Sequence, residues 1–219
     1  MRHLLRRLFR SPMFTAVTLL TVAVGIGATT AVFSVVNGVL LKPLPYPQAD
    51  QLVAIEHTAP GLKLPQLPTS PSLYFTYREH GTVFQDVGMW QGDQLNVTGL
   101  NEPEQVEGMD VTDGLLPLLG VQPILGRTFT RADDQPNAAK TAMLSYGYWQ
   151  RKFGGDRGVI GKVMQIDSES REVIGVLPEG LRLDNRNPAI LIPLAFDRSK
   201  VHLGNFSYNA IGRLKAGVA

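Results

Sequence analysis

The sequence predicts a mixed α/β (α+β) domain preceded by one transmembrane helix. Residues 11–41 carry no charged side chain, whereas the chain after them alternates short apolar runs with Gly- and Pro-rich turns. Strand-like and helix-like runs follow one another irregularly in that second part, which favours a mixed sheet over a doubly wound one. Hydrophobic residues make up 44% of the chain and charged residues 18%, so there are enough apolar side chains for a buried core.

The charges are unevenly distributed along the chain. Residues 1–10 contain four arginines and no acidic residue, whereas residues 43–219 contain 16 Lys+Arg and 19 Asp+Glu, a net charge of −3. A nucleic-acid-binding domain needs clustered positive charge on its folded part, so this distribution argues against nucleic acid as a partner. The chain has no cysteine, which excludes disulfides, thiolate zinc sites and cysteine nucleophiles.

The uncharged segment is long enough to cross a membrane as a helix. Its 31 residues extend about 46 Å at about 1.5 Å per residue, against a hydrocarbon core of roughly 30 Å. Ser11 is placed to cap this helix and Pro12 suits its first turn, while the prolines of KPLPYP end it. We therefore divide the chain into a basic tail (1–10), a transmembrane helix (11–42), a Pro-rich linker (43–51) and a folded domain (52–219).

The charges beside the span predict its orientation. Arg2, Arg6, Arg7 and Arg10 precede it, and only Lys42 follows it closely. The positive-inside rule places the tail in the cytoplasm and the domain on the far side, with the arginines beside anionic membrane lipid. A cleaved signal peptide is the main alternative, but its apolar core usually runs only about 7–15 residues before a small-residue cleavage site.

Small side chains form a stripe along the predicted membrane helix. Ala23, Gly27 and Ala31 recur at every fourth position, and Ser34 and Gly38 lie near the same face. Because small residues let two membrane helices approach closely, we expect this stripe to pack against another helix. The plain alternative is that Gly and Ala are simply common in membrane helices.

The domain itself is predicted from local patterns. Ser70 and Ser145 are predicted N-caps of two helices, the first running to about His80 and the second ending at Gly154-Gly155. The Gly- and Pro-rich residues 60–68 are predicted to form a loop, and 113–119 a short helix. The predicted strands are 52–59, 86–98, 104–112, TAML at 141–144, 190–194 and 210–214, with a hairpin of KVMQID and REVIGVLP around SES.

A search for chemistry finds no catalytic set. The nearest phosphate-loop match, GDRGVIGKV at 155–163, is one residue too long and ends in valine, and MLSYG at 143–147 lacks the first glycine of a nucleophile elbow. The four histidines are isolated and show no metal-ligand spacing. Asp133 and Asp134 are expected to face solvent on a loop. We therefore expect no cofactor, no metal and no enzymatic activity, and favour binding or mechanical coupling.

Longer motifs resemble a known family over essentially the whole chain. SPMFTAVTLLTVAVGIGATTAVFSVVNGVLLKPLPYP resembles the first membrane helix of MacB/FtsX-type ABC transporter permeases, and most closely that of the duplicated permeases found in acidobacteria. The rest resembles the MacB-like periplasmic core domain. That resemblance lies in LNVTGLNEPEQVEGMDVTDGLLPLLGVQPILGRTFTRADD, in LSYGYWQRKFGGDRGVIGKVMQIDSESREVIGVLPEG and in IGRLKAGV.

The resemblance implies a permease component of an ABC transporter in the bacterial inner membrane. Such permeases couple a separate cytoplasmic ABC ATPase subunit to movement of a periplasmic domain for efflux or export, beside other permease helices or a second permease copy. They carry no catalytic residues in this domain. A full permease continues past RLKAGV into more domain and three further membrane helices, so the resemblance implies that the core domain is C-terminally incomplete here.

Two other functions remain open at the level of sequence. A membrane-anchored periplasmic binding or adaptor protein without transport activity fits a chain that ends after one span. A membrane-anchored hydrolase with Ser145 as nucleophile is the third possibility, and the weakest, because Ser145 is better placed as a helix cap.

Overall fold

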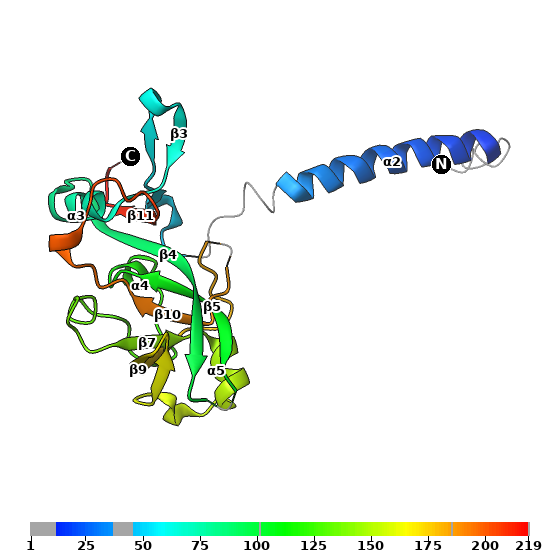
Figure 1. Ribbon diagram of the computed structural model, residues 1–219. Coiled ribbons are helices and arrows are strands. Elements are labelled where there is room, and N and C mark those ends of the chain that lie inside the picture. The colour runs from blue at the N-terminus through cyan, green and yellow to red at the C-terminus, as the bar shows by residue number, and fades with distance from the viewer. Residues whose placement is uncertain (1–11, 37–45, 101, 185, 219) are drawn as a thin grey trace. The chain divides into compact units, whose positions relative to one another are not determined.

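The computed structural model describes residues 12–36, 46–100, 102–184 and 186–218. The chain divides into two compact units, residues 1–45 and 46–219, and each is considered by itself (Figure 1). The first unit contains helix α2, Pro12–Val36, and the second contains the folded domain. The basic tail, residues 43–45 of the predicted linker and Gly38 lie outside the described residues. The predicted domain boundaries therefore stay predictions.

Helix α2 has the length and composition of a membrane span. It is the one candidate span among the described residues, and its 25 residues extend about 37 Å at about 1.5 Å per residue. Three threonine hydroxyls donate to the carbonyl four residues earlier at 2.9 Å, so these polar groups are satisfied within the helix (Thr18 to Phe14, Thr21 to Val17 and Thr29 to Gly25).

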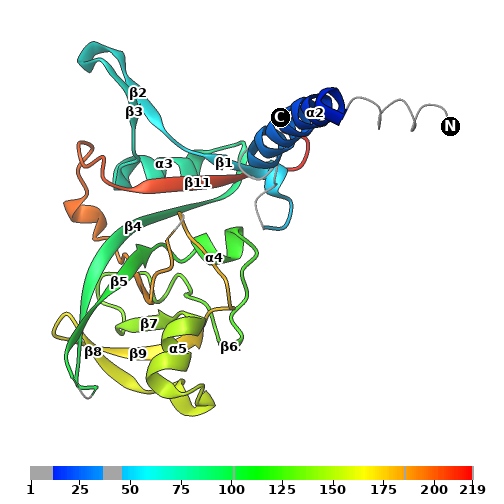
Figure 2. The ribbon, with the colours of Figure 1, turned by 90° about the vertical axis from the view of Figure 1, so that its right-hand side faces the viewer.

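Strand β4, Phe84–Thr98, is the longest of nine strands that form one sheet in the described part of the domain. Its first half pairs with β11, Asn209–Leu214, and its second half with β5, Glu104–Val111. Trp90 is paired with Asn209 of β11 on one edge and with Val111 of β5 on the other. The neighbouring strand therefore changes from one edge of β4 to the other at this residue. The strand therefore belongs to two parts of the domain at once (Figures 1 and 2).

The second half of β4 closes into a ring of strands. The order runs from β4 through β5, β10, β7, β9 and β8, and the last strand pairs with β4 again at Val97 and Thr98. Strand β10 is parallel to β5 and antiparallel to β7, and β7 is parallel to β9, so the sheet is mixed. The bounds of these strands are Thr141–Leu144 for β7, Val163–Ile166 for β8, Glu169–Val176 for β9 and Ile190–Pro193 for β10.

The remaining elements complete the fold class that the sequence predicts. Strand β1, Leu52–Ala54, pairs with β11, and β6, Leu125–Gly126, pairs with β9 at the other end of the sheet. The helices of the domain are α3 (Pro71–His80), α4 (Leu115–Leu118) and α5 (Tyr146–Phe153). A mixed α/β domain together with one candidate transmembrane helix is therefore confirmed.

Buried side chains lie on both faces of the central strands. In β10, Ile190 and Ile192 belong to one cluster with Leu144, while Leu191 belongs to another with Met143. Strands covered on both faces are apolar at every position, which explains the unbroken TAML and ILIP runs. The core is also closely packed: a Cβ atom on Gly108 of β5 would lie 2.3 Å from Leu95 Cδ1 of β4, so a larger residue there would displace this buried side chain.

Two predicted caps and one predicted turn of the domain are confirmed, while the predicted cap Ser11 lies outside the described residues. The Ser70 Oγ accepts a hydrogen bond from the Leu73 N–H, and the Ser145 Oγ accepts one from the Tyr148 N–H at 3.2 Å. Helix α5 ends at Gly154, which has a left-handed φ of 58°. The β8–β9 hairpin turns through residues 167–168, where both φ angles are positive.

The predictions for 52–59 and 60–68 are wrong in part. The first strand ends at Ala54, and the chain leaves the sheet to form a second hairpin of β2, His57–Ala59, and β3, Leu64–Leu67. The turn η3, Pro60–Leu62, joins the two strands. Pro65 reads as a loop residue, but a proline is tolerated on an edge strand because no neighbour needs its missing N–H. This hairpin projects from the β1–β11 end of the sheet (Figure 2).

Asp110 places a carboxyl group between two neighbouring strands in the interior of the sheet. It lies on β5 opposite Gln91 of β4 and Ile192 of β10, and its Oδ1 is buried with no hydrogen-bond partner among the described residues. Burial, reinforced by the nearby Asp93, raises the pKa of Asp110 to about 7. The raised pKa means that ionised Asp110 opposes folding.

We predict that Asp110→Asn stabilises the domain at pH 8 by about 1–3 kcal/mol, because the amide removes the cost of a buried charge. A carboxyl whose pKa rises on folding stabilises the fold below its ordinary pKa of 3.8, and that contribution is lost as the pH rises toward 7. The gain should therefore fade below about pH 4. Urea unfolding followed by the fluorescence of Trp90 and Trp149 measures it, and an equal gain at pH 4 and pH 8 would contradict the assignment.

Candidate functional site: a polar cleft beside helix α3

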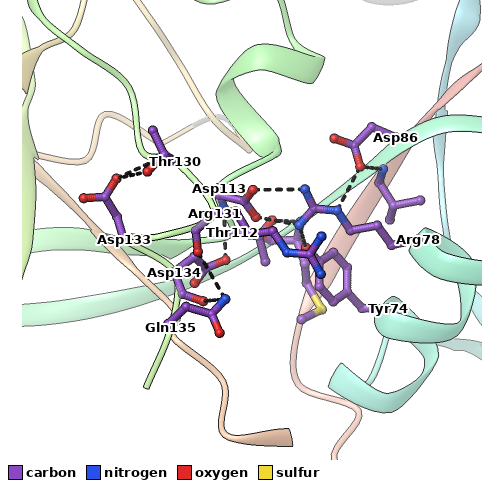
Figure 3. Close-up of polar contacts among 12 residues, drawn as sticks. Tyr74, Arg78, Asp86, Thr112, Asp113, Thr130, Arg131, Asp133, Asp134 and Gln135 are labelled. Carbon is purple, nitrogen blue, oxygen red and sulfur yellow. Dashed lines mark hydrogen bonds and ion pairs between the residues drawn. The ribbon is translucent and has the colours of Figure 1, made fainter. Parts of the chain in front are cut away.

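A cleft of the described domain lies beside helix α3 and has a volume of about 760 Å³. Its walls come from α3, the start of β4, Asp113 after β5, the loop at 131–135, and Phe196 and Arg198. Figure 3 shows the polar contacts of the residues on the first four of these segments. The charged side chains that matter for its chemistry are Arg78, Glu79, Asp113, Arg131, Asp134 and Arg198.

Arg78 is the centre of the polar contacts in this cleft. Its Nη1 and Nη2 donate to the two carboxylate oxygens of Asp113 at 2.5 and 3.0 Å, and its Nε lies 3.1 Å from Asp86 Oδ1. Nη1 also donates to the Tyr74 hydroxyl at 2.6 Å, which the i, i+4 spacing on α3 permits. The Asp113 hydrogen bonds raise the pKa of Arg78, and burial raises the pKa of Tyr74 to about 12.

Asp134 connects two loops that are distant in sequence. Its Oδ2 accepts from the Asp113 backbone N–H at 3.0 Å, and its Oδ1 accepts from the Ala195 N–H at 2.7 Å. Burial raises the pKa of Asp134 above its ordinary value, against the opposing effect of these two hydrogen bonds. The segment after β5 and the segment after β10 are therefore held together by one carboxyl group.

Asp133 corrects the expectation that this acidic pair faces solvent. Its carboxylate is only 8% exposed, because it accepts two hydrogen bonds from Arg127, at 2.7 and 2.9 Å. The Thr130 N–H and hydroxyl add two more, at 2.8 and 2.6 Å. Burial alone would raise its pKa, but the bonds from Arg127 and Thr130 outweigh burial and lower the pKa to about 2. The loop folds back on itself around this side chain.

Two further arginines line the outer part of the cleft. Arg198 forms a two-pronged ion pair with Glu79, with both N–O distances 2.8 Å, and its guanidinium lies 4.4 Å from the centre of the Phe75 ring. The Arg131 side chain has no hydrogen bond or ion pair with any described residue. The cleft therefore contains one cation that is free to meet a ligand.

The described lining of this cleft contains arginine, carboxylate, glutamine and aromatic side chains, and it includes no serine, threonine, lysine or histidine. Ser145, the one serine that resembles a nucleophile in sequence, has its Oγ engaged as the cap of α5. His57 is one of the described histidines, and its ring stacks on that of Tyr77 with ring centres 5.8 Å apart. No group of three or more His, Asp or Glu side chains in the described parts of the chain is placed to hold a metal ion.

The predicted helix-packing residues lie in the other unit. Ala23, Gly27, Ala31 and Ser34 are exposed along α2, and Gly38 lies outside the described residues. A Cβ atom on Gly27 would meet nothing within 4 Å, so the space beside this glycine is open. None of the cleft residues was predicted as a site residue, because Arg78 and Asp113 are 35 positions apart and no spacing in the sequence links them.

The described residues combine a mixed α/β domain with one helix long and apolar enough to cross a membrane, as in a membrane-anchored domain. Comparison with protein families identifies it: the MacB-like periplasmic core domain matches residues 15–219. The chain therefore belongs to the MacB-like periplasmic core domain family, which is found in ABC transporter permeases. Among curated proteins, no sequence matches this chain.

Solved structures share the fold. A domain assigned to a permease protein from Porphyromonas gingivalis is 19% identical, with a TM-score of 0.60 over 80% of this chain and 78% of that one. The periplasmic region of MacB from Actinobacillus actinomycetemcomitans is 15% identical, with a TM-score of 0.58 over 77% and 76%. The extracellular domain of the noncanonic ABC-type transporter YknZ from Gram-positive bacteria is 17% identical, with a TM-score of 0.52 over 75% and 85%.

We predict that Asp133→Asn costs about 2 kcal/mol of unfolding free energy at pH 7, because the amide cannot replace the charge-assisted bonds to Arg127. A carboxyl whose pKa falls on folding stabilises the fold above its ordinary pKa of 3.8, and this is lost as the pH falls toward 2. The difference between the two proteins should thus shrink between pH 4 and pH 2 in urea titrations. A difference that stays constant down to pH 2 would refute the ion pair as its cause.

Proposed function

We propose that this chain is the permease component of an ABC transporter, in which a separate cytoplasmic ATPase drives movement of a periplasmic domain for efflux or export. The observation that carries the proposal is the extent of the family match, which begins inside helix α2 and includes the whole described domain. Helix and domain thus occur together as one unit of the family. The chemistry of ATP hydrolysis then belongs to the partner, and this chain is not an enzyme.

The proposed location is the bacterial inner membrane, with the tail in the cytoplasm and the domain in the periplasm. The charge distribution supports it, because four arginines precede helix α2 and the domain that follows is mildly acidic. The internally bonded threonines support a lipid environment, because in lipid a hydroxyl without such a bond is costly.

The proposed partner surface within the membrane is the stripe of Ala23, Gly27, Ala31, Ser34 and Gly38. The open space beside Gly27 supports it, because a helix from a second permease copy or from another permease segment can approach there without displacing a side chain.

The alternative function is that of a membrane-anchored periplasmic binding or adaptor protein without transport activity. The cleft beside α3 favours it, because a volume of about 760 Å³ lined by both arginine and carboxylate side chains suits a polar ligand. The two functions differ in their partners, since only the permease needs a cytoplasmic ATPase. Recovery of that ATPase therefore separates them.

We predict that a cysteine at Lys200 reacts with a membrane-impermeant maleimide from the periplasmic side, because this side chain is 81% exposed on the domain. The chain has no native cysteine, so the label reports one position. A matched cysteine at His3 should react only after the inner membrane is broken. If His3→Cys were labelled in cells with an intact inner membrane while Lys200→Cys did not react with the maleimide, the proposed topology would be contradicted.

We also predict that Gly27→Leu lowers co-purification of a second, differently tagged copy and of the ATPase several-fold, because the larger side chain fills the space that the partner helix needs. Val32→Leu is the matched control, since it adds bulk to the opposite face of α2. Equal recovery with both variants would exclude the stripe as a contact. Failure of the unmodified chain to recover any ATPase would favour the adaptor function.

A further inference from the structure

Arg213 is a buried arginine that has no carboxylate partner among the described residues. It lies on β11 and is 7% exposed, opposite Leu52 of β1 and Asp86 of β4. A buried guanidinium is costly unless its donors are hydrogen-bonded. The hydrogen bonds of the guanidinium therefore show which segments Arg213 holds together.

The guanidinium donates to three backbone carbonyls. Its Nε donates to the Leu118 oxygen at 2.8 Å, its Nη1 to the Gln48 oxygen at 3.2 Å and its Nη2 to the Pro47 oxygen at 3.0 Å. Leu118 is the last residue of α4, where carbonyls lack partners within the helix and attract a cation. One side chain thus joins strand β11, the end of α4 and the first residues of the domain.

Tyr46 and Pro47 strengthen the same attachment. The Tyr46 ring packs against the buried cluster that contains Leu118, and its hydroxyl donates to the Arg182 oxygen at 2.7 Å. The Pro47 ring lies against Gly120: a Cβ there would be 2.9 Å from Pro47 Cγ. Gly120 also has a φ of +69°, which favours glycine. Tyr46 and Pro47 therefore pack closely against the buried cluster and against Gly120.

The backbone carbonyl of Gln48 links Arg213 to the turn that follows Gln48. Its carbonyl accepts from Arg213 and also from the Gln51 N–H at 3.0 Å, and the Leu52 N–H bonds to the Ala49 oxygen. Gln48 itself has a left-handed φ of 49°, a conformation that a non-glycine residue keeps only when its surroundings hold it. The 3-10 turn Ala49–Gln51 and the first strand are thus fixed relative to Arg213.

We propose that Arg213 is a positioning residue that fixes Tyr46–Gln48, the first residues of the domain, to strand β11 and helix α4. A displacement that arrives along the chain at residue 46 then moves the sheet, because peeling the segment away would leave the guanidinium buried without two of its acceptors. The transmitting role rests on the proposed permease function. The attachment itself is a property of the domain alone.

The test uses the full chain in lipid nanodiscs, with the variants Arg213→Met and Arg213→Lys. Hydrogen exchange at the Gln51 and Leu52 amides should accelerate about tenfold or more in Arg213→Met, and less in Arg213→Lys, whose single ammonium keeps only part of the contacts. A nitroxide on Gln48→Cys should gain a mobile component in its EPR spectrum in both variants. The matched control is Arg151→Met, an exposed arginine on α5, which should change neither readout.

The outcomes separate the proposal from simple destabilisation. Unfolding followed by tryptophan fluorescence reports whether each variant is folded, and if Arg213→Met does not fold, Arg213→Lys decides. Unchanged exchange and an unchanged spectrum in a folded Arg213 variant would overturn the proposal. In the assembled complex, a loosened segment with undiminished ATP-driven domain movement would overturn the transmitting role. Absence of such movement in the unmodified complex would count against the permease function alone.

Discussion

Strand β4 is the constraint on which the rest of the domain depends. Its 15 residues pair with β11 on one side over the first half and with β5 on the other side over the second half. A strand that is shared in this way cannot move in one part of the domain without moving in the other, because both ladders use the same backbone. The ring that closes through β8 then fixes the far end of the strand.

Long-range polar contacts connect the loops that the sheet leaves free. Arg78 joins α3 to Asp113, and Asp134 joins Asp113 to Ala195, so four segments between residues 71 and 195 meet beside the change of partner on β4. These groups are partly buried, and removing one partner would leave the other buried and unpaired, which is costly. The network therefore favours a single arrangement of the loops around the cleft.

The sequence predicts the fold where a local signal decides the structure. Ser70 and Ser145 lie directly before helices, and the unbroken apolar strands identify the centre of the sheet, because caps and burial act over a few residues. It does not predict the β2–β3 hairpin, in which Pro65 is tolerated only because β3 is an edge. Nor does it predict the burial of Asp134, which is bonded to Ala195 61 positions away. Asp133 is missed for another reason: its partners Arg127 and Thr130 lie within six positions, but only the folded loop turns them toward it.

A domain can transmit a displacement only if the contacts within the domain do not deform under it. Here the first residues of the domain are attached through Arg213 to β11, β11 is paired with β4, and β4 leads into the closed ring. Each step is a backbone ladder or a buried, hydrogen-bonded side chain, and such contacts in a close-packed core yield in cooperative units instead of stretching gradually. The exposed hairpin and the cleft lie beside this route, so a bound partner at either place would be carried with the sheet.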